Sequence, residues 1–317
     1  MQPSQRWQEL LAERLQEALS VLAGTPGVHG FLVGGSVGRG EPWPMSDIDL
    51  LPVCTGDHAR AAAELERRHA RLVDWWAASG RAQTLDMGAL AFTTAEIRDA
   101  VRAGPEFAAA RMGDRRWFHG LDKAFGGYGT DELGTAFTAW IARIRFDPAV
   151  VAARLDVWRG QARDALTRAQ RAGDPAAATR LLQESARAGR MVLLESWGER
   201  LGSMGREWTR FERMAARHGH ADIAARIAVL AGADVDSAAQ RAERAPAWLR
   251  ERIDLCLGAR RAVGEQVSAA ENARDQLAAF ALHVARHRPD LDGDWTGCPD
   301  PLLAERLSEM AGLDAIY

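Results

Sequence analysis

Residues 34–50 read GGSVGRGEPWPMSDIDL, and this stretch decides how the first part of the chain folds. It follows the largely apolar segment VHGFLVG at 28–34, which is typical of a buried strand, and it ends in alternating acidic and apolar residues. Side chains at positions i and i+2 of a strand point to the same face of a sheet. We therefore expect a second strand at 47–53, with Asp47 and Asp49 side by side and the apolar residues between them facing the core.

The two neighbouring carboxylates allow two interpretations. Asp47 and Asp49 have no basic neighbour in the sequence, so they repel each other and the free energy of ionising both is raised. A hard divalent cation such as Mg²⁺ relieves this repulsion, because it prefers carboxylate oxygens as ligands. A solvent-exposed strand edge also tolerates two acids. The pair alone therefore leaves both a metal site and an ordinary surface open.

The glycines before the aspartates favour a phosphate-binding turn. Gly34, Gly35 and Ser36 follow the first strand, where glycine lets backbone N–H groups approach a phosphate and a helix start leaves such donors unpaired. Arg39 would add a guanidinium to the same anion. Two familiar phosphate loops do not fit. The P-loop requires a lysine where Glu41 stands, and the dinucleotide fingerprint Gly-x-Gly-x-x-Gly would run in reverse order.

The arrangement that remains is an apolar strand ending in Gly-Ser, followed twelve residues later by Asp-Ile-Asp-Leu at the start of the next strand. It resembles the signature of the polymerase-β nucleotidyltransferase superfamily. The segment GSVGRGEPWPMSDIDLL is especially similar to short bacterial nucleotidyltransferase domains, antibiotic nucleotidyltransferases and protein uridylyltransferases. The resemblance covers about residues 26–125 and implies an α/β catalytic domain, a small mixed sheet with helices.

The resemblance also requires a third carboxylate on a later strand beside the first two. Asp74 lies in RLVDWWAAS, which has helical periodicity and is typical of a solvated helix face. Asp86 lies in QTLDMGAL, within a predicted strand at 82–92. Its neighbours are apolar, and an unpaired carboxylate there would be costly without a cation. We therefore expect Asp86 to be the third acid.

The reaction that the resemblance implies is in-line displacement at the α-phosphorus of a nucleoside triphosphate, expected to be ATP, with pyrophosphate as the leaving group. Asp47 and Asp49 would bind two Mg²⁺ ions, and Asp86 would complete the acceptor-side ion and take up the proton of a small-molecule hydroxyl. A protein or RNA acceptor is the first alternative. A domain that binds nucleotide without catalysis is the second, and the intact set of three acids argues against it.

Other residues of the same stretch would bind the nucleotide. Gly35, Ser36 and Arg39 would hold the β- and γ-phosphates in the arrangement that the resemblance implies. Trp43 stands between two prolines, so its backbone is stiff. Its indole either faces a nucleobase or packs on its own loop as a surface tryptophan.

Helical and strand patterns alternate in the first part of the chain, and helical patterns dominate the rest. The glycine cluster GGYGT at 126–130 is the strongest candidate for a linker. We therefore predict a catalytic α/β domain at 1–127 and an all-helical domain at 128–317 that binds the acceptor or a partner. Thr94 is placed to cap a helix that follows it. Further helices are predicted at 4–23, 57–79, 131–144, 148–171, 175–201, 207–217, 220–231, 245–270 and 272–287.

The helical part offers one candidate for an acceptor-side base. Glu195 lies in MVLLESWGERL, on the expected seam of the helices, and antibiotic-modifying relatives recruit a glutamate base from their helical domain. Glu184 lies eleven residues earlier and therefore on nearly the same helical face. A plain surface acid is the simpler interpretation of either residue.

Composition narrows the classes of partner. The net charge of −3 gives no overall field that would attract nucleic acid or an anionic membrane, so neither is an expected partner. Lys123 is the single lysine among 40 basic residues, which we attribute to a general preference for arginine. The three cysteines form no Cys-x-x-Cys pair, and no apolar run is long enough for a signal peptide or a membrane span. We therefore expect a cytoplasmic protein.

Overall fold

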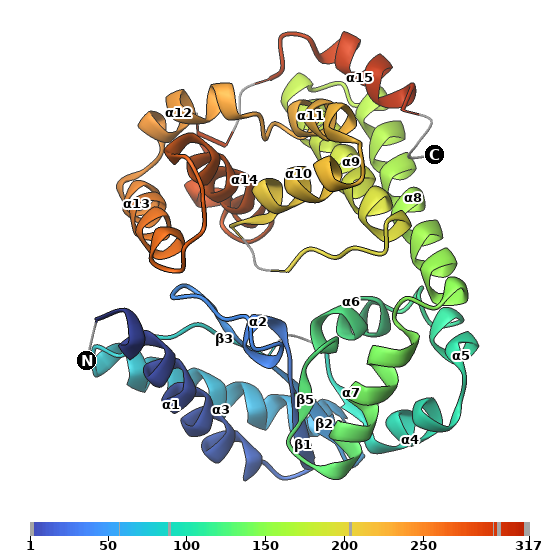
Figure 1. The fold of residues 1–317 in the computed structure, drawn as a ribbon, viewed down its shortest axis with the longest axis vertical. Coiled ribbons are helices and arrows are strands. Elements are labelled where there is room, and N and C mark those ends of the chain that lie inside the picture. The colour runs from blue at the N-terminus through green and yellow to red at the C-terminus, as the bar shows by residue number, and fades with distance from the viewer. Residues whose placement is uncertain are drawn as a thin grey trace. The chain divides into compact units, whose positions relative to one another are not determined.

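The computed structural model divides the chain into two compact units, Met1–Arg154 and Leu155–Tyr317. The first contains a small mixed sheet with helices, and the second is helical (Figure 1). This is the predicted order of an α/β part and an all-α part, although the division lies beyond the predicted boundary at 127. The residues that the structure describes are 3–56, 58–87, 90–202, 205–293, 295–296 and 299–313.

Five strands of the described chain form the sheet, in the order β3-β2-β1-β5, with β4 also paired with β2. The central pair, β1 (Val28–Val33) and β2 (Ile48–Cys54), is antiparallel. β3 (Leu85–Asp86) and β4 (Phe92–Thr93) both run parallel to β2. β5 (Tyr128–Gly129) is antiparallel to β1 and closes the sheet on the other side.

Two predictions about this sheet are wrong in detail. Among the described residues of the predicted strand at 82–92, those that pair with β2 are Leu85–Asp86 and Phe92, the first residue of β4. The glycine cluster at 126–130 is not a linker, since it contains β5. A Cβ at Gly127 would overlap with the carbonyl oxygen of Val33, so glycine lets this segment approach β1 closely.

One face of the sheet is covered by α1 (Pro3–Ala23) and α3 (His58–Ala78), which pack against each other (Figure 1). Both helices place apolar residues at helical spacing towards the strands, as the sequence predicted. The strands contribute alternate residues to the same cluster, as expected from the period of two. The buried cluster comprises Leu11, Leu15, Ala18, Leu22, Phe31, Val33, Ile48, Leu50, Leu65, Leu72, Trp76 and Leu85.

The opposite face is covered as well, so every residue of β2 is buried. Glycines permit the close approach of two helices there: a Cβ at Gly120 would collide with the ring of Phe92, and one at Gly134 would contact Leu32. Thr93, not Thr94, is the N-cap of the helix that follows β4, and it forms a capping box with Glu96. The remaining helices of this unit are α2 (Gly35–Gly38), α4 (Thr94–Arg102), α5 (Pro105–Ala109), α6 (Arg115–Ala124) and α7 (Glu132–Ile144).

The helices of the second part follow the predicted order, with two additions at 235–244 and 303–311. The predicted helix at 245–270 ends at Ala262, and the one at 175–201 ends at Ser196. The elements are α8 (Pro148–Arg171), which runs through the division, α9 (Pro175–Ser196), α10 (Glu207–Arg217), α11 (Ala221–Leu230), α12 (Val235–Arg244), α13 (Ala247–Ala262), α14 (Ala269–His287), η1 (Pro289–Leu291) and α15 (Leu303–Ala311).

A buried carboxylate ties three helices of the second unit together. Asp275 on α14 is 1% exposed and accepts hydrogen bonds from the backbone N–H groups of Trp208 and Thr209 at the start of α10. It also accepts a hydrogen bond from Arg260 Nη1 of α13 at 2.8 Å. Among the residues that the structure describes, none of the helices combines the length and the apolar character that a membrane span needs.

Candidate metal centre

Three carboxylates converge at one end of strands β2 and β3. Asp49 lies opposite Asp86 in the parallel register of the two strands, and Asp47 precedes β2 by one residue. One oxygen atom from each of the three side chains lies within 4.8 Å of the others. The structure thus brings together the three acids that the sequence singled out, whereas Asp74 is exposed on α3.

A lysine that sequence reasoning missed lies between two of these acids. The Nζ atom of Lys123, on α6, is 2.7 Å from Oδ1 of Asp49 and also donates a hydrogen bond to Oδ2 of Asp86. Asp86 is therefore paired and 43% exposed, not isolated in an apolar setting as predicted. The signal available in the sequence was that Lys123 is the single lysine, which we attributed to composition alone.

The electrostatics of the site reflect three acids that lie close to one another and to Lys123. Burial, followed by the negative charge of Asp49, raises the pKa of Asp47 to about 6. Burial by itself would lower the pKa of Lys123, but the carboxylates of Asp49 and Asp86 raise it above its ordinary value. Lys123 is therefore an ammonium ion at neutral pH. Three carboxylates against one ammonium leave two negative charges, which is the charge that one divalent cation neutralises.

The glycine turn after β1 makes room for these charged groups. Gly35 has a φ of +60°, and a Cβ built on it would overlap with the carboxylate of Asp49. A Cβ on Gly34 would overlap with the carbonyl oxygen of Lys123, and the N–H of Gly34 donates to the carbonyl oxygen of Asp49 at 2.9 Å. The two glycines thus let β1, β2 and α6 meet at the acid cluster.

Ser36 and Arg39 are the other predicted phosphate ligands, and their hydrogen-bond donors have different partners in the structure. The Ser36 hydroxyl is buried and donates to Oγ of Ser46 at 2.8 Å, so its proton already has an acceptor. Ser46 also accepts from the backbone N–H of Trp43, which fixes the loop between α2 and β2. The Arg39 side chain is 9% exposed, and its Nε has no hydrogen-bond acceptor among the described residues. The same Nε lies 3.6 Å from Oε2 of Glu41, so the Arg39 charge has a nearby carboxylate.

The remaining candidates lie in settings that the sequence did not predict. Trp43 is 3% exposed, so it is neither a surface tryptophan nor an indole open to a nucleobase. Glu195 is 2% exposed on α9 and is not a plain surface acid. Glu184 lines a cavity of the second unit and is partly exposed.

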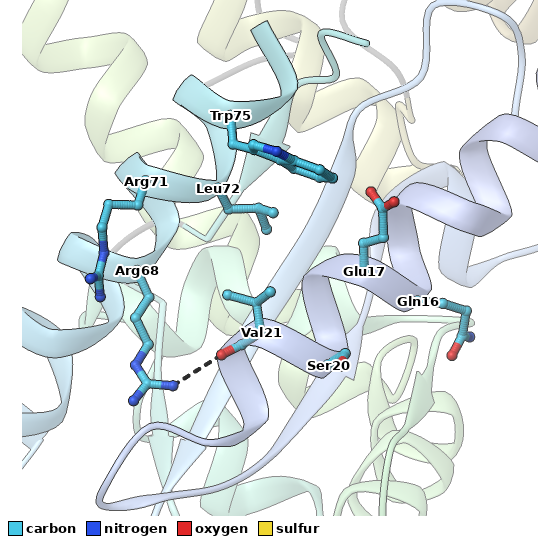
Figure 2. Close-up of a pocket in the computed structure, with 8 residues that line it drawn as sticks. All are labelled: Gln16, Glu17, Ser20, Val21, Arg68, Arg71, Leu72 and Trp75. Atoms are coloured by element: carbon cyan, nitrogen blue, oxygen red, sulfur yellow. Dashed lines mark hydrogen bonds between the residues drawn. The ribbon is translucent and has the colours of Figure 1, made fainter. Parts of the chain in front are cut away.

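A separate groove of about 680 Å³ lies between α1 and α3, and Figure 2 shows the residues that line it. The Trp75 ring lies over Leu72, and Arg68 donates a hydrogen bond to the carbonyl oxygen of Val21 at 3.1 Å. None of the three acids lines this groove. The groove is therefore distinct from the acid cluster.

The donor set of the acid cluster fits a hard divalent cation. Asp47, Asp49 and Asp86 offer carboxylate oxygens alone, which suit Mg²⁺ rather than the softer metals that histidine and cysteine select. Two of the three oxygens are held by Lys123, so a cation would compete with its ammonium group for them. No protein-family model, curated protein or solved structure matches this chain.

Proposed function

We propose that this chain is a metal-dependent nucleotidyltransferase, which transfers a nucleoside monophosphate from a nucleoside triphosphate to a hydroxyl group of a small molecule. The observation that carries the proposal is the convergence of Asp47, Asp49 and Asp86 at adjacent strand ends, next to the Gly34-Gly35 turn. The resemblance of residues 26–125 to polymerase-β-like nucleotidyltransferases supports the same reaction, because that family requires three acids in this order.

Each acid has a role in the proposed reaction. Asp47 and Asp49 would hold a divalent cation, which when bound neutralises the triphosphate and polarises its α-phosphoryl group. The acceptor oxygen forms a bond to the α-phosphorus while the bond to the bridging oxygen breaks, and pyrophosphate leaves with the electron pair. Asp49 and Asp86 both contact Lys123, and the Asp86 side chain is the more exposed of the two. Asp86 is therefore better placed to receive the hydroxyl proton.

Two basic residues would bind the triphosphate in this proposal. Arg39 has only a long ion pair, from Nε to Oε2 of Glu41 at 3.6 Å, and its guanidinium suits the β- or γ-phosphate. Lys123 loses its carboxylate partners when a cation takes them, and its ammonium is then free to bind a phosphate oxygen. The net charge of the three acids and Lys123 balances one divalent cation. The second predicted Mg²⁺ would therefore need the negative charge of the triphosphate, which we expect to be ATP.

The direct test separates binding from transfer. Isothermal titration with Mg²⁺ and an ATP analogue that carries a methylene group between the α- and β-phosphorus should show Mg²⁺-dependent binding. Asp49→Asn should abolish it, and Asp74→Asn, which removes an exposed acid of α3, should not. Transfer is then measured with each α-labelled triphosphate and a panel of aminoglycosides and other hydroxylated metabolites, as label in the acceptor together with release of unlabelled pyrophosphate. Full metal-dependent transfer by Asp49→Asn would refute the mechanism.

One observation favours a second function, nucleotide binding without transfer. The ammonium group of Lys123 already bridges Asp49 and Asp86, as a metal ion would. A protein of this kind would bind the ATP analogue equally well with Mg²⁺ and with EDTA. Binding that requires Mg²⁺ would exclude this second function.

A further inference from the structure

The second unit contains a cavity of about 400 Å³ that the proposed reaction does not use. It lies among α8, α9, α10 and α14, and all the residues that line it belong to the second unit. A volume of this size suits a small organic ligand. The lining combines two indoles with charged groups and includes Trp158, Glu184, Arg187, Arg190, Glu207 and Trp208.

Arg190 is a buried cation with unused hydrogen-bond donors. Its side chain is 7% exposed, and neither Nε nor Nη1 has an acceptor among the described residues. Its Nη2 lies 3.6 Å from Oε2 of Glu207, which is too long for a good hydrogen bond. The guanidinium lies over the Trp208 ring, with Cζ at 4.3 Å from the ring centroid, and this stacking fixes its position. Buried N–H groups without acceptors are destabilising, so an acceptor from outside the chain would be favourable.

A second arginine lines the same cavity one helical turn earlier. Arg187 and Arg190 are three residues apart on α9 and therefore share a face of the helix. Within the described part of the chain, no carboxylate oxygen lies within ion-pair distance of the Arg187 guanidinium. Burial and then the like charge of Arg190 lower the pKa of Arg187 to about 10, and burial also lowers the pKa of Arg190. Two adjacent cations thus share one close counter-charge, the Glu207 carboxylate.

The acids of the cavity neutralise these two arginines only in part. Asp164 is exposed and lies 3.5 Å from Arg168, so this pair neutralises itself at the surface. Glu207 reaches only one nitrogen of Arg190, and Glu184 forms no ion pair with either buried arginine within the described residues. These two glutamates are instead available as acceptors for donor groups of a ligand.

We propose that this cavity binds a small organic anion, a carboxylate or a phosphate monoester on a flat apolar body that also carries a hydroxyl or amino group. The oxyanion would accept paired hydrogen bonds from Arg190 and Arg187, since the planar guanidinium matches both groups. The apolar body would contact the indoles of Trp158 and Trp208. Glu184 and Glu207 would accept hydrogen bonds from the hydroxyl or amino group. None of the residues assigned to the nucleotide site lines this cavity.

Titration calorimetry of the full chain with four probes tests the proposal. We expect 4-hydroxyphenylacetate or 4-aminophenyl phosphate to bind, and either result identifies the oxyanion. Tyramine, which has a similar body with a positive charge, should not bind. Inorganic phosphate should bind at least about tenfold more weakly than the better organic anion, because it lacks the apolar body.

Variants show where the anion binds. Arg190→Met should weaken binding by about tenfold to a hundredfold, as expected for loss of a charge-assisted hydrogen bond. Arg187→Met, which alters a less buried side chain, tests the same site if Arg190→Met fails to fold. Arg180→Met is the matched control, since Arg180 is an exposed arginine of α9 outside the cavity lining. Asp49→Asn alters the acid cluster and no residue of the cavity, so this variant should bind the organic anion with wild-type affinity. Loss of nucleotide transfer and loss of anion binding can therefore be told apart.

Three results would overturn the proposal. The first is no binding of either organic anion. The second is equal binding of tyramine, which would show that charge is not recognised. The third is unchanged affinity in folded Arg187→Met and Arg190→Met variants, which would place the anion elsewhere.

Discussion

Lys123 shows how a single side chain sets the charge balance of the acid cluster. Its ammonium group holds Asp49 and Asp86 together without a metal ion. The other 39 of the 40 lysine and arginine residues are arginines. The planar guanidinium group is wider than an ammonium group and presents its donors in fixed directions. A compact ammonium is better suited to a position between two strand-end carboxylates, and it yields more readily to a divalent cation.

The first prediction concerns the removal of this ammonium. Lys123→Met should lower the free energy of unfolding by about 1–3 kcal/mol in EDTA, because three carboxylates lose their counter-charge. Mg²⁺ should then raise the melting temperature more in the variant than in the wild type, since the cation no longer competes with the lysine. Lys123→Arg, which keeps the charge, should recover most of the lost stability. Equal Mg²⁺-induced shifts in Lys123→Met and the wild type would contradict the competition.

The second prediction concerns pH. Because the pKa of Asp47 is raised to about 6 from an ordinary value of 3.8, the folded state binds a proton more tightly than the unfolded state. Asp47 therefore lowers stability increasingly as the pH rises from about 4 to 6, and the loss persists above pH 6. Asp47→Asn removes this loss, so in EDTA it should stabilise the protein by about 1–3 kcal/mol at pH 8 and have little effect at pH 4.

Urea unfolding at both pH values, followed by circular dichroism, measures this difference. A stabilisation of equal size at pH 4 and pH 8 would show that ionisation of Asp47 is not its cause. Added Mg²⁺ should reverse the order at pH 8, because only the wild type retains the Asp47 ligand.

At the scale of elements, the turn between β1 and α2 determines whether the acids can meet. Gly35 and Gly40 both have positive φ angles, +60° and +70°. A Cβ on Gly35 would overlap with the Asp49 carboxylate, whereas a Cβ on Gly40 would meet no atom within 4 Å. Alanine at Gly40 would therefore introduce backbone strain alone, whereas alanine at Gly35 would introduce the same kind of strain and an overlap with Asp49.

The third prediction uses this pair. Gly40→Ala should cost about 1–2 kcal/mol of stability from backbone strain alone and leave Mg²⁺ affinity unchanged. Gly35→Ala should cost more and should also weaken Mg²⁺ binding by at least about tenfold, because it displaces the Asp49 carboxylate. Chemical denaturation and metal titration measure the two effects. Equal Mg²⁺ affinity in the two variants would show that Gly35 serves only the turn.

Element boundaries were predicted best where the signal is local. Helices such as α3 and α8 were predicted to within one residue, because their pattern repeats every turn. β3, β4 and β5 have two residues each and exist only because they pair with β2 or β1. Such pairing depends on segments far apart in the chain, so neither propensity nor periodicity reveals it.

At the scale of the whole molecule, the chain distributes its buried charged groups over two compact units. Asp47, Asp49, Asp86 and Lys123 all lie within Met1–Arg154. The Asp275 hub and the Arg190 cavity lie within Leu155–Tyr317. Each unit thus contains a network of buried charges of its own.

The fourth prediction follows for hydrogen exchange. Mg²⁺ with the ATP analogue should slow amide exchange at the ends of β1 and β2, in α2 and in the last turn of α6. It should leave α10 and α14, which the Asp275 carboxylate ties together, at their ligand-free rates. Mass-spectrometric exchange with and without ligand measures both. Protection of α10 and α14 equal to that of β2 would show that the two units respond together.

The sequence by itself determined the order of α/β and helical parts and the spacing that places Asp47 and Asp49 on one side of a strand. The sequence also favoured Asp86 over Asp74 as the third acid, because the residues around Asp86 are typical of a strand and those around Asp74 have the periodicity of a helix. Only the tertiary structure decided that Lys123 joins these acids. The physical reason is that periodicity is a local property, whereas the approach of α6 to β2 depends on packing and on the absence of side chains at Gly34 and Gly35.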